Sequence, residues 1–332
     1  MKPITVSTNT LTKFPKRKNR FPKGIKKGIK ELPKELNEFP EGVNEFPEGK
    51  GKFPKATNEF PKGTSGFPEG RASLHVWRWL LILLVVQFGP VARLRAEPEN
   101  PSALLQKADR LDDTDHFLEA ITLLKDLEKS DPRNVEILYR ISRVDSDLVD
   151  DLPDDAKKKG YDYAVESVAY AKKAMEADPK SSEAHLAAAI AYGVMTDFVD
   201  DRTKMEYSKI IKAGAEKAIE LDPKNDYAYL VLARWNFEMT QLNPILKGIA
   251  ELLYGQMPPA SQEKALEDFQ KAVDLAPDKM IHHFCYGEAL ARLGRKAEAR
   301  AEYQKVLRLA PTCREERGYQ QKASSALKTL GR

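Results

Sequence analysis

The sequence has few of the side chains on which catalytic centres, metal sites and disulfide scaffolds depend. Of its 332 residues, only two are cysteines and five are histidines, so neither a disulfide framework nor a cysteine-rich zinc site is predicted. It also lacks a glycine-rich phosphate loop, a nucleophile elbow and a His-Glu-x-x-His motif. We therefore expect no catalytic residue, no metal site and no cofactor. Cys285 and Cys313 are expected to be buried thiols, and a disulfide between them in an oxidising compartment is the alternative.

Two short stretches come closest to a metal site, and neither has the required pattern. The stretch "HHFC", from His282 to Cys285, lies on one predicted helix, where neighbouring side chains point in different directions. The acidic stretch "DSDLVDDLPDD", residues 145–155, lacks the turn glycine and the terminal glutamate of a calcium-binding loop. We expect helix packing for the first and a solvated loop for the second. A metal-dependent enzyme accessory that uses His282 and His283 is the less favoured alternative.

The net charge of +4 combines two segments of opposite sign. Residues 1–96 carry 19 Lys and Arg against 8 Asp and Glu, a net charge of +11, whereas residues 97–332 carry 35 against 42, a net charge of −7. An acidic domain without basic runs is a poor ligand for a phosphate backbone. We therefore expect no nucleic-acid partner.

Residues 1–75 are dominated by a low-complexity array in which Phe-Pro recurs every seventh residue, from Phe39 to Phe67. A proline in every heptad breaks helices, and the frequent glycine and charge leave too little apolar surface to bury. We expect this segment to be disordered. It is either a multivalent Phe-Pro ligand or, as we favour, a translated tandem DNA repeat that precedes the true start.

Residues 76–96 have the layout of a secretory signal peptide. Arg78 precedes an apolar stretch from Trp79 to Val86, and a Gly-Pro break and small residues then lead to Ala96. The apolar stretch is shorter than the roughly 20 residues that span a bilayer. We expect cleavage after Ala96 and a periplasmic or secreted protein. An uncleaved signal anchor in a membrane, or a cytoplasmic protein in which the segment is unused, are the alternatives.

Residues 97–332 form a tetratricopeptide-like repeat domain by their internal self-similarity. Proline-containing phrases close successive helical stretches, and the last unit has Gly287, Ala299, Tyr303 and Pro311 at the offsets of the tetratricopeptide pattern. The predicted fold is all-α, a solenoid of helical hairpins. Its units are 101–134, 135–181, 182–225, 226–279 and 280–313, followed by a capping helix within 314–332.

A partner-binding surface is predicted along the concave side of this solenoid, which the first helix of each unit lines. Arginines interleaved with aromatic side chains there suit an acidic or extended peptide. The residues that the helical period places on this side are Tyr139, Arg143, Tyr227, Arg234, Phe237, Glu288 and Arg292. We therefore expect a protein or peptide partner, with a membrane partner only if residues 76–96 remain uncleaved.

The unit 226–279 contains an insertion that carries a family resemblance. Trp235, the segment "KGIAELLYG", then "PPAS", "EKAL" and "GEALARLG" follow one another up to the C-terminal helix. From about Lys180 onward the chain resembles the regulator of microtubule dynamics family. The resemblance implies a non-enzymatic helical adaptor, linked in animal members to microtubules and in some to organelle membranes. Within the insertion, Ile245, Leu246, Ile249, Leu252 and Leu253 are expected to form the apolar face of a short third helix.

The native protein is expected to begin near Glu97, since the signal-like segment predicts cleavage after Ala96. Amino-terminal sequencing of the protein purified from its source measures this directly. Recovery of a mature chain that contains the Phe-Pro array would contradict both the cleavage and the late start.

Overall fold

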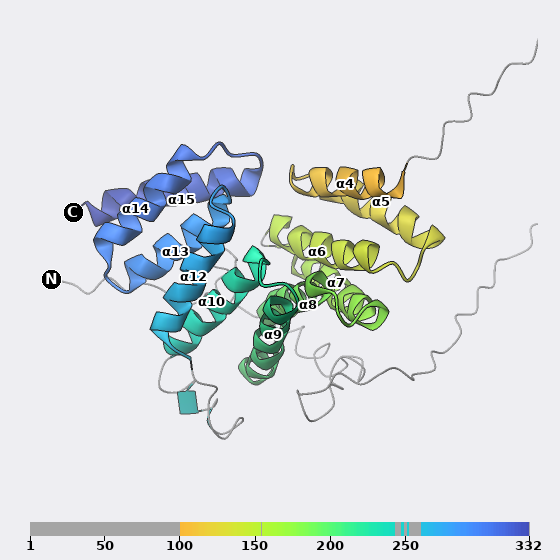
Figure 1. The fold of residues 1–332 in the computed structure, drawn as a ribbon, viewed down its shortest axis with the longest axis horizontal. Helices are drawn as coiled ribbons and strands as arrows, with labels where there is room; N and C mark the ends of the chain where they lie inside the picture. The colour runs from red at the N-terminus through yellow and green to blue at the C-terminus, as the bar shows by residue number, and fades with distance from the viewer. Residues whose placement is uncertain (1–99, 154, 243–246, 249–250, 252–259, 332) are drawn as a thin grey trace, which may run out of the picture. The chain divides into compact units, whose positions relative to one another are not determined.

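A computed structural model describes residues 100–331, apart from 154, 243–246, 249–250 and 252–259. All regular structure in these residues is helical, and it forms a tetratricopeptide-like solenoid (Figure 1). The segments 1–75 and 76–96 and the apolar face predicted for the insertion lie outside the described residues. The helices are α4 (Pro101–Asp112), α5 (Phe117–Ser130), α6 (Val135–Asp151), α7 (Lys157–Ala177), α8 (Ser182–Met195), α9 (Asp201–Leu221), α10 (Asp226–Thr240), α12 (Gln262–Leu275), α13 (Met280–Arg292), α14 (Lys296–Arg308) and α15 (Arg314–Leu330), with a 3₁₀ turn at Thr196–Phe198.

The proline-containing phrases end one helix and start the next. In "DPRN" the backbone of Asp131 caps the C-terminus of α5, while the Asn134 side chain accepts hydrogen bonds from the backbone N–H groups of Glu136 and Ile137 at the start of α6. The same arrangement recurs in "DPKS" before α8 and in "DPKN" before α10. Each phrase therefore satisfies backbone groups that a helix end leaves without partners. This local chemistry fixes where most of the hairpins begin.

Consecutive helices pack as antiparallel pairs, and each pair packs on the next. The pairs are α4 with α5, α6 with α7, α8 with α9, α10 with α12, and α13 with α14. Each of the five predicted units contains one of these pairs. The first helices also contact one another, as α6 does α8, α10 does α13, and α13 does α15. Side chains on these first helices are therefore brought next to each other along one surface.

The two helices of the last pair approach closely at a glycine. A Cβ atom on Gly287 of α13 would lie 3.0 Å from two ring atoms of Tyr303 on α14. Tyr303 is buried there, and Ala299, one turn earlier on α14, is fully buried. Gly287, Ala299 and Tyr303, which lie at tetratricopeptide offsets in the sequence, thus meet at the helix contact, where a Cβ at position 287 would crowd the tyrosine ring.

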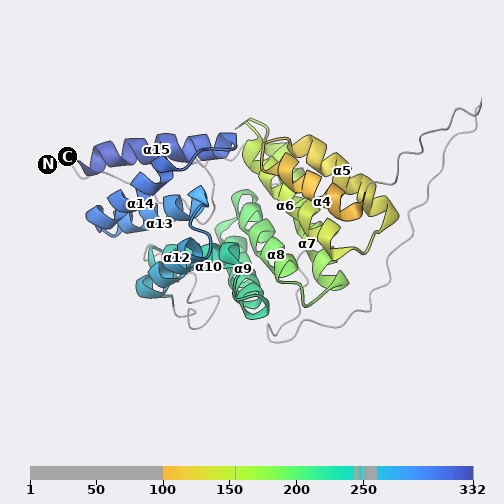
Figure 2. The ribbon, with the colours of Figure 1, turned by 45° about the horizontal axis from the view of Figure 1, so that its top comes forward.

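Helix α15 covers the last pair and also reaches the first. Its Tyr319 ring stacks on Phe284 of α13 with 4.7 Å between ring centroids. At its start, the backbone N–H of Arg314 donates to Oδ2 of Asp115, in the turn between α4 and α5, at 2.5 Å. The Arg314 side chain pairs with Asp151 at the end of α6. Figure 2 shows the start of α15 beside these elements.

The acidic stretch 145–155 is not a solvated loop over most of its length, so that prediction is wrong. Helix α6 continues through it to Asp151. Val144, Leu148 and Val149 are buried, and their helical spacing carries the apolar face onward despite the aspartates between them. Asp145 consequently lies in the interior with no exposed surface.

No helix in the described part of the chain combines the length and the apolar content that crossing a membrane requires.

Substituting Gly287→Val is expected to lower the free energy of unfolding by about 1–3 kcal/mol, because the added methyl groups overpack the buried Tyr303 ring. Denaturant unfolding followed by circular dichroism measures the change. Gly318→Ala on α15 is the matched control, since an added Cβ meets nothing within 4 Å there, and it is expected to stabilise by up to about 1 kcal/mol. Equal effects of the two substitutions would show that the helix contact does not require a glycine.

Candidate functional site

The residues predicted to bind a partner lie on α6, α10 and α13, three of the first helices. We call the surface that they form, together with their neighbours on α4, α8 and α15, the inner face. The structure groups them into two sets, one around Arg143 and Tyr227 and the other around Arg234 and Arg292. Of the seven, only Phe237 is fully buried, so the others keep at least part of their surface accessible.

Arg143 is held by aspartates of the preceding first helix. Its Nη2 lies 2.7 Å from Oδ2 of the buried Asp112 and 3.4 Å from Oδ1 of Asp109, both on α4. These carboxylates raise the pKa of Arg143 against the effect of its burial. The adjacent Arg140 binds Asp109 through two nitrogens, at 2.9 and 3.1 Å, and its guanidinium lies 4.8 Å from the centre of the Tyr139 ring. Arg140 and Arg143 therefore join α6 to α4, and Tyr139 packs against Arg140.

Tyr227 belongs to a cluster that joins α10 to α13. The Lys279 ammonium lies 4.3 Å from the centre of the Tyr227 ring and 2.7 Å from Oδ2 of Asp226. The same carboxylate oxygen is 2.5 Å from Nε2 of the buried His282. Burial alone would raise the pKa of Asp226, but the hydrogen bonds from His282 and Lys279 lower it, and burial lowers the pKa of His282. The site thus holds a lysine over an exposed part of an aromatic ring.

The second set lies farther along α10 and α13. The Arg292 guanidinium pairs with both carboxylate oxygens of Glu238, the second at 3.2 Å, and lies 4.5 Å from the centre of the Phe237 ring. Nη1 of Arg234 is 3.9 Å from Sγ of Cys285. Burial raises the pKa of Glu288, while Arg234, Lys322 and Arg292 oppose the shift. The structure therefore brings the predicted Arg234, Phe237, Glu288 and Arg292 together.

Three carboxyl groups of the inner face are exposed and yet partly desolvated by the protein around them. Asp113, Glu183 and Glu288 are exposed to solvent, yet burial raises the pKa of each. A carboxyl on a flat surface keeps its hydration and would show no such effect. Each of these side chains therefore has protein atoms around it while it keeps exposed surface.

Several members of the inner face were not among the predicted residues. Each of them pairs with a side chain more than 30 positions away in the sequence, as Asp109 does with Arg140 and Asp226 with Lys279. One local signal was available, because Asp226 directly follows the "DPKN" phrase at the first position of a helix, where a carboxylate is favoured. The missed residues are Asp109, Asp112, Asp226, Lys279 and Lys322.

The histidines considered as metal ligands take part in helix packing. His283 is buried, with Nδ1 2.7 Å from Oε2 of Glu302 and Nε2 2.8 Å from the carbonyl oxygen of Pro277. His185 makes the equivalent contact to the carbonyl of Pro179, at 2.9 Å, two units earlier. Among the described residues, no three His, Cys, Asp or Glu side chains cluster as a metal site requires. Cys285 is buried, Cys313 is partly buried, and neither forms a disulfide.

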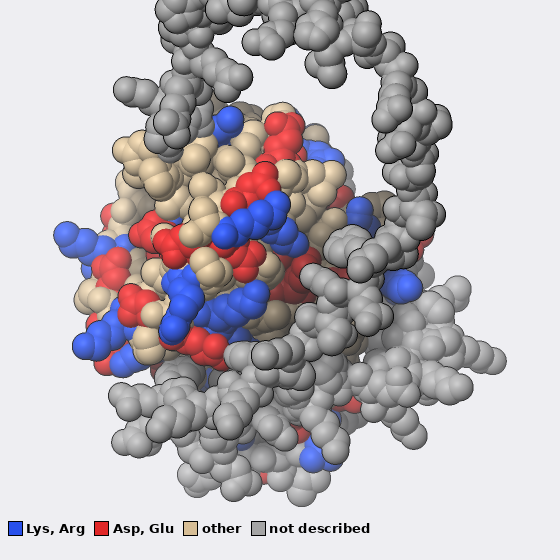
Figure 3. Space-filling view, turned by 90° about the vertical axis from the view of Figure 1, so that its right-hand side faces the viewer, with Lys and Arg blue, Asp and Glu red and all other residues tan. Residues whose placement is uncertain are grey.

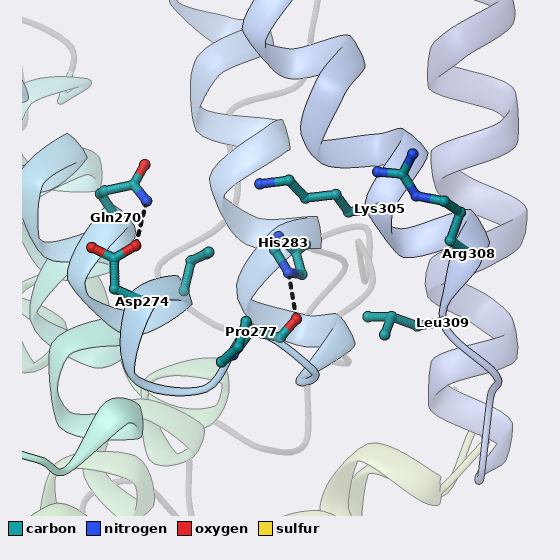
Figure 4. Close-up of a pocket in the computed structure, with 8 residues that line it drawn as sticks. Gln270, Asp274, Pro277, His283, Lys305, Arg308 and Leu309 are labelled. Carbon is teal, nitrogen blue, oxygen red and sulfur yellow. Dashed lines mark hydrogen bonds between the residues drawn. The ribbon is translucent and has the colours of Figure 1, made fainter.

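A separate pocket of about 460 Å³ opens between α12, α13 and α14. His283 lies at its centre, with Gln270 and Asp274 on one side and Lys305 and Arg308 on the other (Figure 4). None of the residues predicted to bind a partner lines it.

On the surface that includes α4 and α5, Lys and Arg side chains lie among Asp and Glu (Figure 3).

Asp145 is the described carboxyl group with the most unusual surroundings. It is fully buried, neither carboxylate oxygen has a hydrogen-bond partner, and burial together with Glu166 raises its pKa to about 7, against the effect of Lys125. Buried groups with shifted pKa values often mark functional sites. Here the group is fully buried, and its consequence is for stability.

Asp145→Asn is expected to stabilise the protein at high pH and not at low pH. The unfolded carboxyl titrates near 3.8, so the native state holds an extra proton between that pH and about 7. Stability from this group is present below the unfolded pKa and is lost as the pH rises toward 7. At pH 8 the substitution should therefore add on the order of 2–4 kcal/mol to the free energy of unfolding, and the gain should vanish near pH 4.

Denaturant unfolding at the two pH values measures this difference. Asp162→Asn, at an exposed position of α7, is the control and should change the free energy of unfolding by less than about 0.5 kcal/mol at either pH. The same gain for Asp145→Asn at pH 4 and pH 8 would show that the carboxyl is not protonated in the native state.

The comparisons with known proteins agree with the repeat architecture. A family model described as regulator of microtubule dynamics protein 1-3 matches residues 104–331, a wider range than the sequence motifs indicated. Regulator of microtubule dynamics protein 2 of Homo sapiens is 27% identical over 193 residues, 58% of this chain and 47% of that protein. Regulator of microtubule dynamics protein 3 of Xenopus laevis is 29% identical over 181 residues, 54% of this chain and 39% of that protein. The chain thus spans about half the length or less of these curated relatives.

Among solved structures, a thermophilic TPR protein of Thermus thermophilus is similar in fold. It is 19% identical, and the match covers 68% of this chain and 98% of that protein with a TM-score of 0.49.

Proposed function

This chain belongs to the regulator of microtubule dynamics family, and from that membership we propose that it is a non-enzymatic scaffold that binds a protein or peptide partner along its inner face. The observation that carries the proposal is that accessible charged and aromatic side chains from successive first helices meet along one surface. Tyr227 with Lys279, and Arg234 with Glu288, are examples on α10 and α13. Helices hold these groups in place, so little conformational entropy is lost on binding.

A non-enzymatic role is supported by what the ionisable groups of the inner face do. Arg143, Lys279 and Arg292 are each paired with a carboxylate of a neighbouring helix. Such pairs set the spacing of the repeats and display polar surface, which suits recognition. We propose no catalytic residue, metal or cofactor.

A microtubule-associated adaptor, anchored to a membrane if residues 76–96 remain uncleaved, is the second candidate. It is favoured by the names of the relatives, which describe regulators of microtubule dynamics. The net charge of −7 over residues 97–332 argues against simple electrostatic attraction of this domain to acidic surfaces. For the cleaved form we propose a periplasmic or secreted location, where the partner would be an extracytoplasmic protein.

Photo-crosslinking tests the inner-face proposal directly. A benzophenone amino acid is introduced at Tyr139 or Tyr227 on the inner face, and at Leu118 or Leu307, which are exposed on the second helices α5 and α14, as controls. Irradiation in the source cells is expected to give one discrete cross-linked partner from the inner positions and not from the outer ones. The partner is then identified by mass spectrometry and its affinity for the full chain is measured by titration calorimetry.

Cross-links from all four positions alike, or from the outer positions only, would contradict binding along the inner face. Co-sedimentation of the full chain with polymerised tubulin separates the second candidate. Saturable and salt-resistant co-sedimentation would support the microtubule role, and its absence would leave a different protein as the partner.

A further inference from the structure

Three cationic side chains from successive first helices share one part of the inner face. Arg234 lies on α10, Arg292 on α13 and Lys322 on α15, and all three act electrostatically on Glu288 of α13. Arg292 is already neutralised, because it forms a two-point ion pair with Glu238. Neither Arg234 nor Lys322 has a carboxylate oxygen within 4 Å among the described residues. The cluster therefore presents more positive charge than its own acids balance at contact distance.

Packed side chains lie beneath two cations of this cluster, and for Lys322 they are stacked aromatic rings. Phe284 and Tyr319 are buried and stacked with 4.7 Å between their ring centroids. The Lys322 ammonium lies 5.7 Å from the centre of the first ring and 5.8 Å from that of the second. The Arg234 side chain is partly buried beside Cys285. Both cations thus contact packed side chains, which limits the conformational entropy that they lose when they bind an anion.

The excess of positive charge is confined to this cluster, and its sign is opposite to that of the net charge of the domain. Residues 97–332 carry a net charge of −7. At the other end of the inner face, the cations near Asp113 and Glu183 are Arg140, Arg143 and Lys279, and each of them is paired with a carboxylate. Cations without a contacting carboxylate therefore lie at the α10–α13–α15 end, which gives an acidic segment of a ligand a preferred place on the inner face.

We propose that the inner face between α10, α13 and α15 binds an acidic segment of the protein partner, with Arg234 and Lys322 donating hydrogen bonds to its carboxylates. This inference rests on the proposed scaffold function and specifies its ligand. Glu288 competes with the incoming carboxylates for the same two cations. Burial raises the pKa of Glu288 and Glu238 adds to the rise, while Arg234, Lys322 and Arg292 oppose it.

Substitutions at neighbouring residues are therefore expected to change the affinity for an acidic peptide in opposite directions. The probe is a fluorescein-labelled peptide of glutamates interspersed with phenylalanine, and its binding to the full chain is followed by fluorescence anisotropy. Arg234→Gln and Lys322→Gln should each weaken binding about 5-fold or more, as the loss of a partly desolvated charge pair predicts. Glu288→Gln should tighten binding by a similar factor, a gain that misfolding does not produce. Arg308→Gln on α14 and Lys271→Gln on α12, both exposed, are the matched controls and should leave binding unchanged.

Two further comparisons decide the outcome. The same peptide with glutamine in place of glutamate should bind at least about 10-fold more weakly, and binding of the acidic peptide should weaken as salt is raised. Equal binding of the two peptides, or an unchanged or reduced affinity of the Glu288→Gln variant, would overturn the acidic-segment inference. If cross-links from the inner face persist in that case, the scaffold function stands and only the charge of its ligand is wrong. If those cross-links fail as well, the scaffold function itself fails.

Discussion

The close approach of the two helices in each hairpin is the constraint on which the rest of this structure depends. On α13 it requires Gly287, because the Tyr303 ring occupies the space that a Cβ would take. On α9 it requires Gly214, where an added Cβ would lie 3.0 Å from the carbonyl oxygen of His185 on α8. Because the second helix packs this closely against the first, it covers one side of the first helix. The opposite side is left for the charged and aromatic residues, and it becomes the inner face.

Charge pairs then connect one first helix to another. Arg143 reaches Asp112 across α6 and α4, Lys279 reaches Asp226 across α13 and α10, and Arg292 reaches Glu238 across the same two helices. These pairs are partly buried, so breaking one would leave its partner poorly solvated. These ion pairs neutralise most of the charged side chains on the inner face. The groups that remain at the α10–α13–α15 end therefore stand out as available for a ligand.

The sequence was sufficient for the fold and for the helices of the site, but not for the pairing of its side chains. Proline phrases and the Gly287–Tyr303 spacing are local signals, and the family motifs around Trp235 identified the same family as the profile match. Helical periodicity placed Arg234 and Glu288 on the same surface, since it needs only the period of one helix. The pairing of Arg143 with Asp112 depends instead on how one hairpin stacks on another, which no single helix encodes.

Asp145 shows the opposite failure. Four aspartates within seven residues suggested solvent, yet buried Val144, Leu148 and Val149 continued the apolar period and kept the segment helical. Hydrophobic spacing outweighed composition, because the burial of three aliphatic side chains is worth more than the cost of one neutral carboxyl. Periodicity was therefore the better guide than acidity at this position.

The contacts of Arg314 with Asp115 and Asp151 alter how such an array comes apart. In an open array each terminal hairpin has a single neighbour, so unfolding starts as fraying at the ends and spreads inward. Here the turn of the first hairpin is hydrogen-bonded to the start of the last helix, which gives each end a second neighbour. The repeats between these ends are already folded, so such bonds form without the entropy cost of closing a long flexible loop. The array then loses its helices in a more concerted step, as a compact domain does.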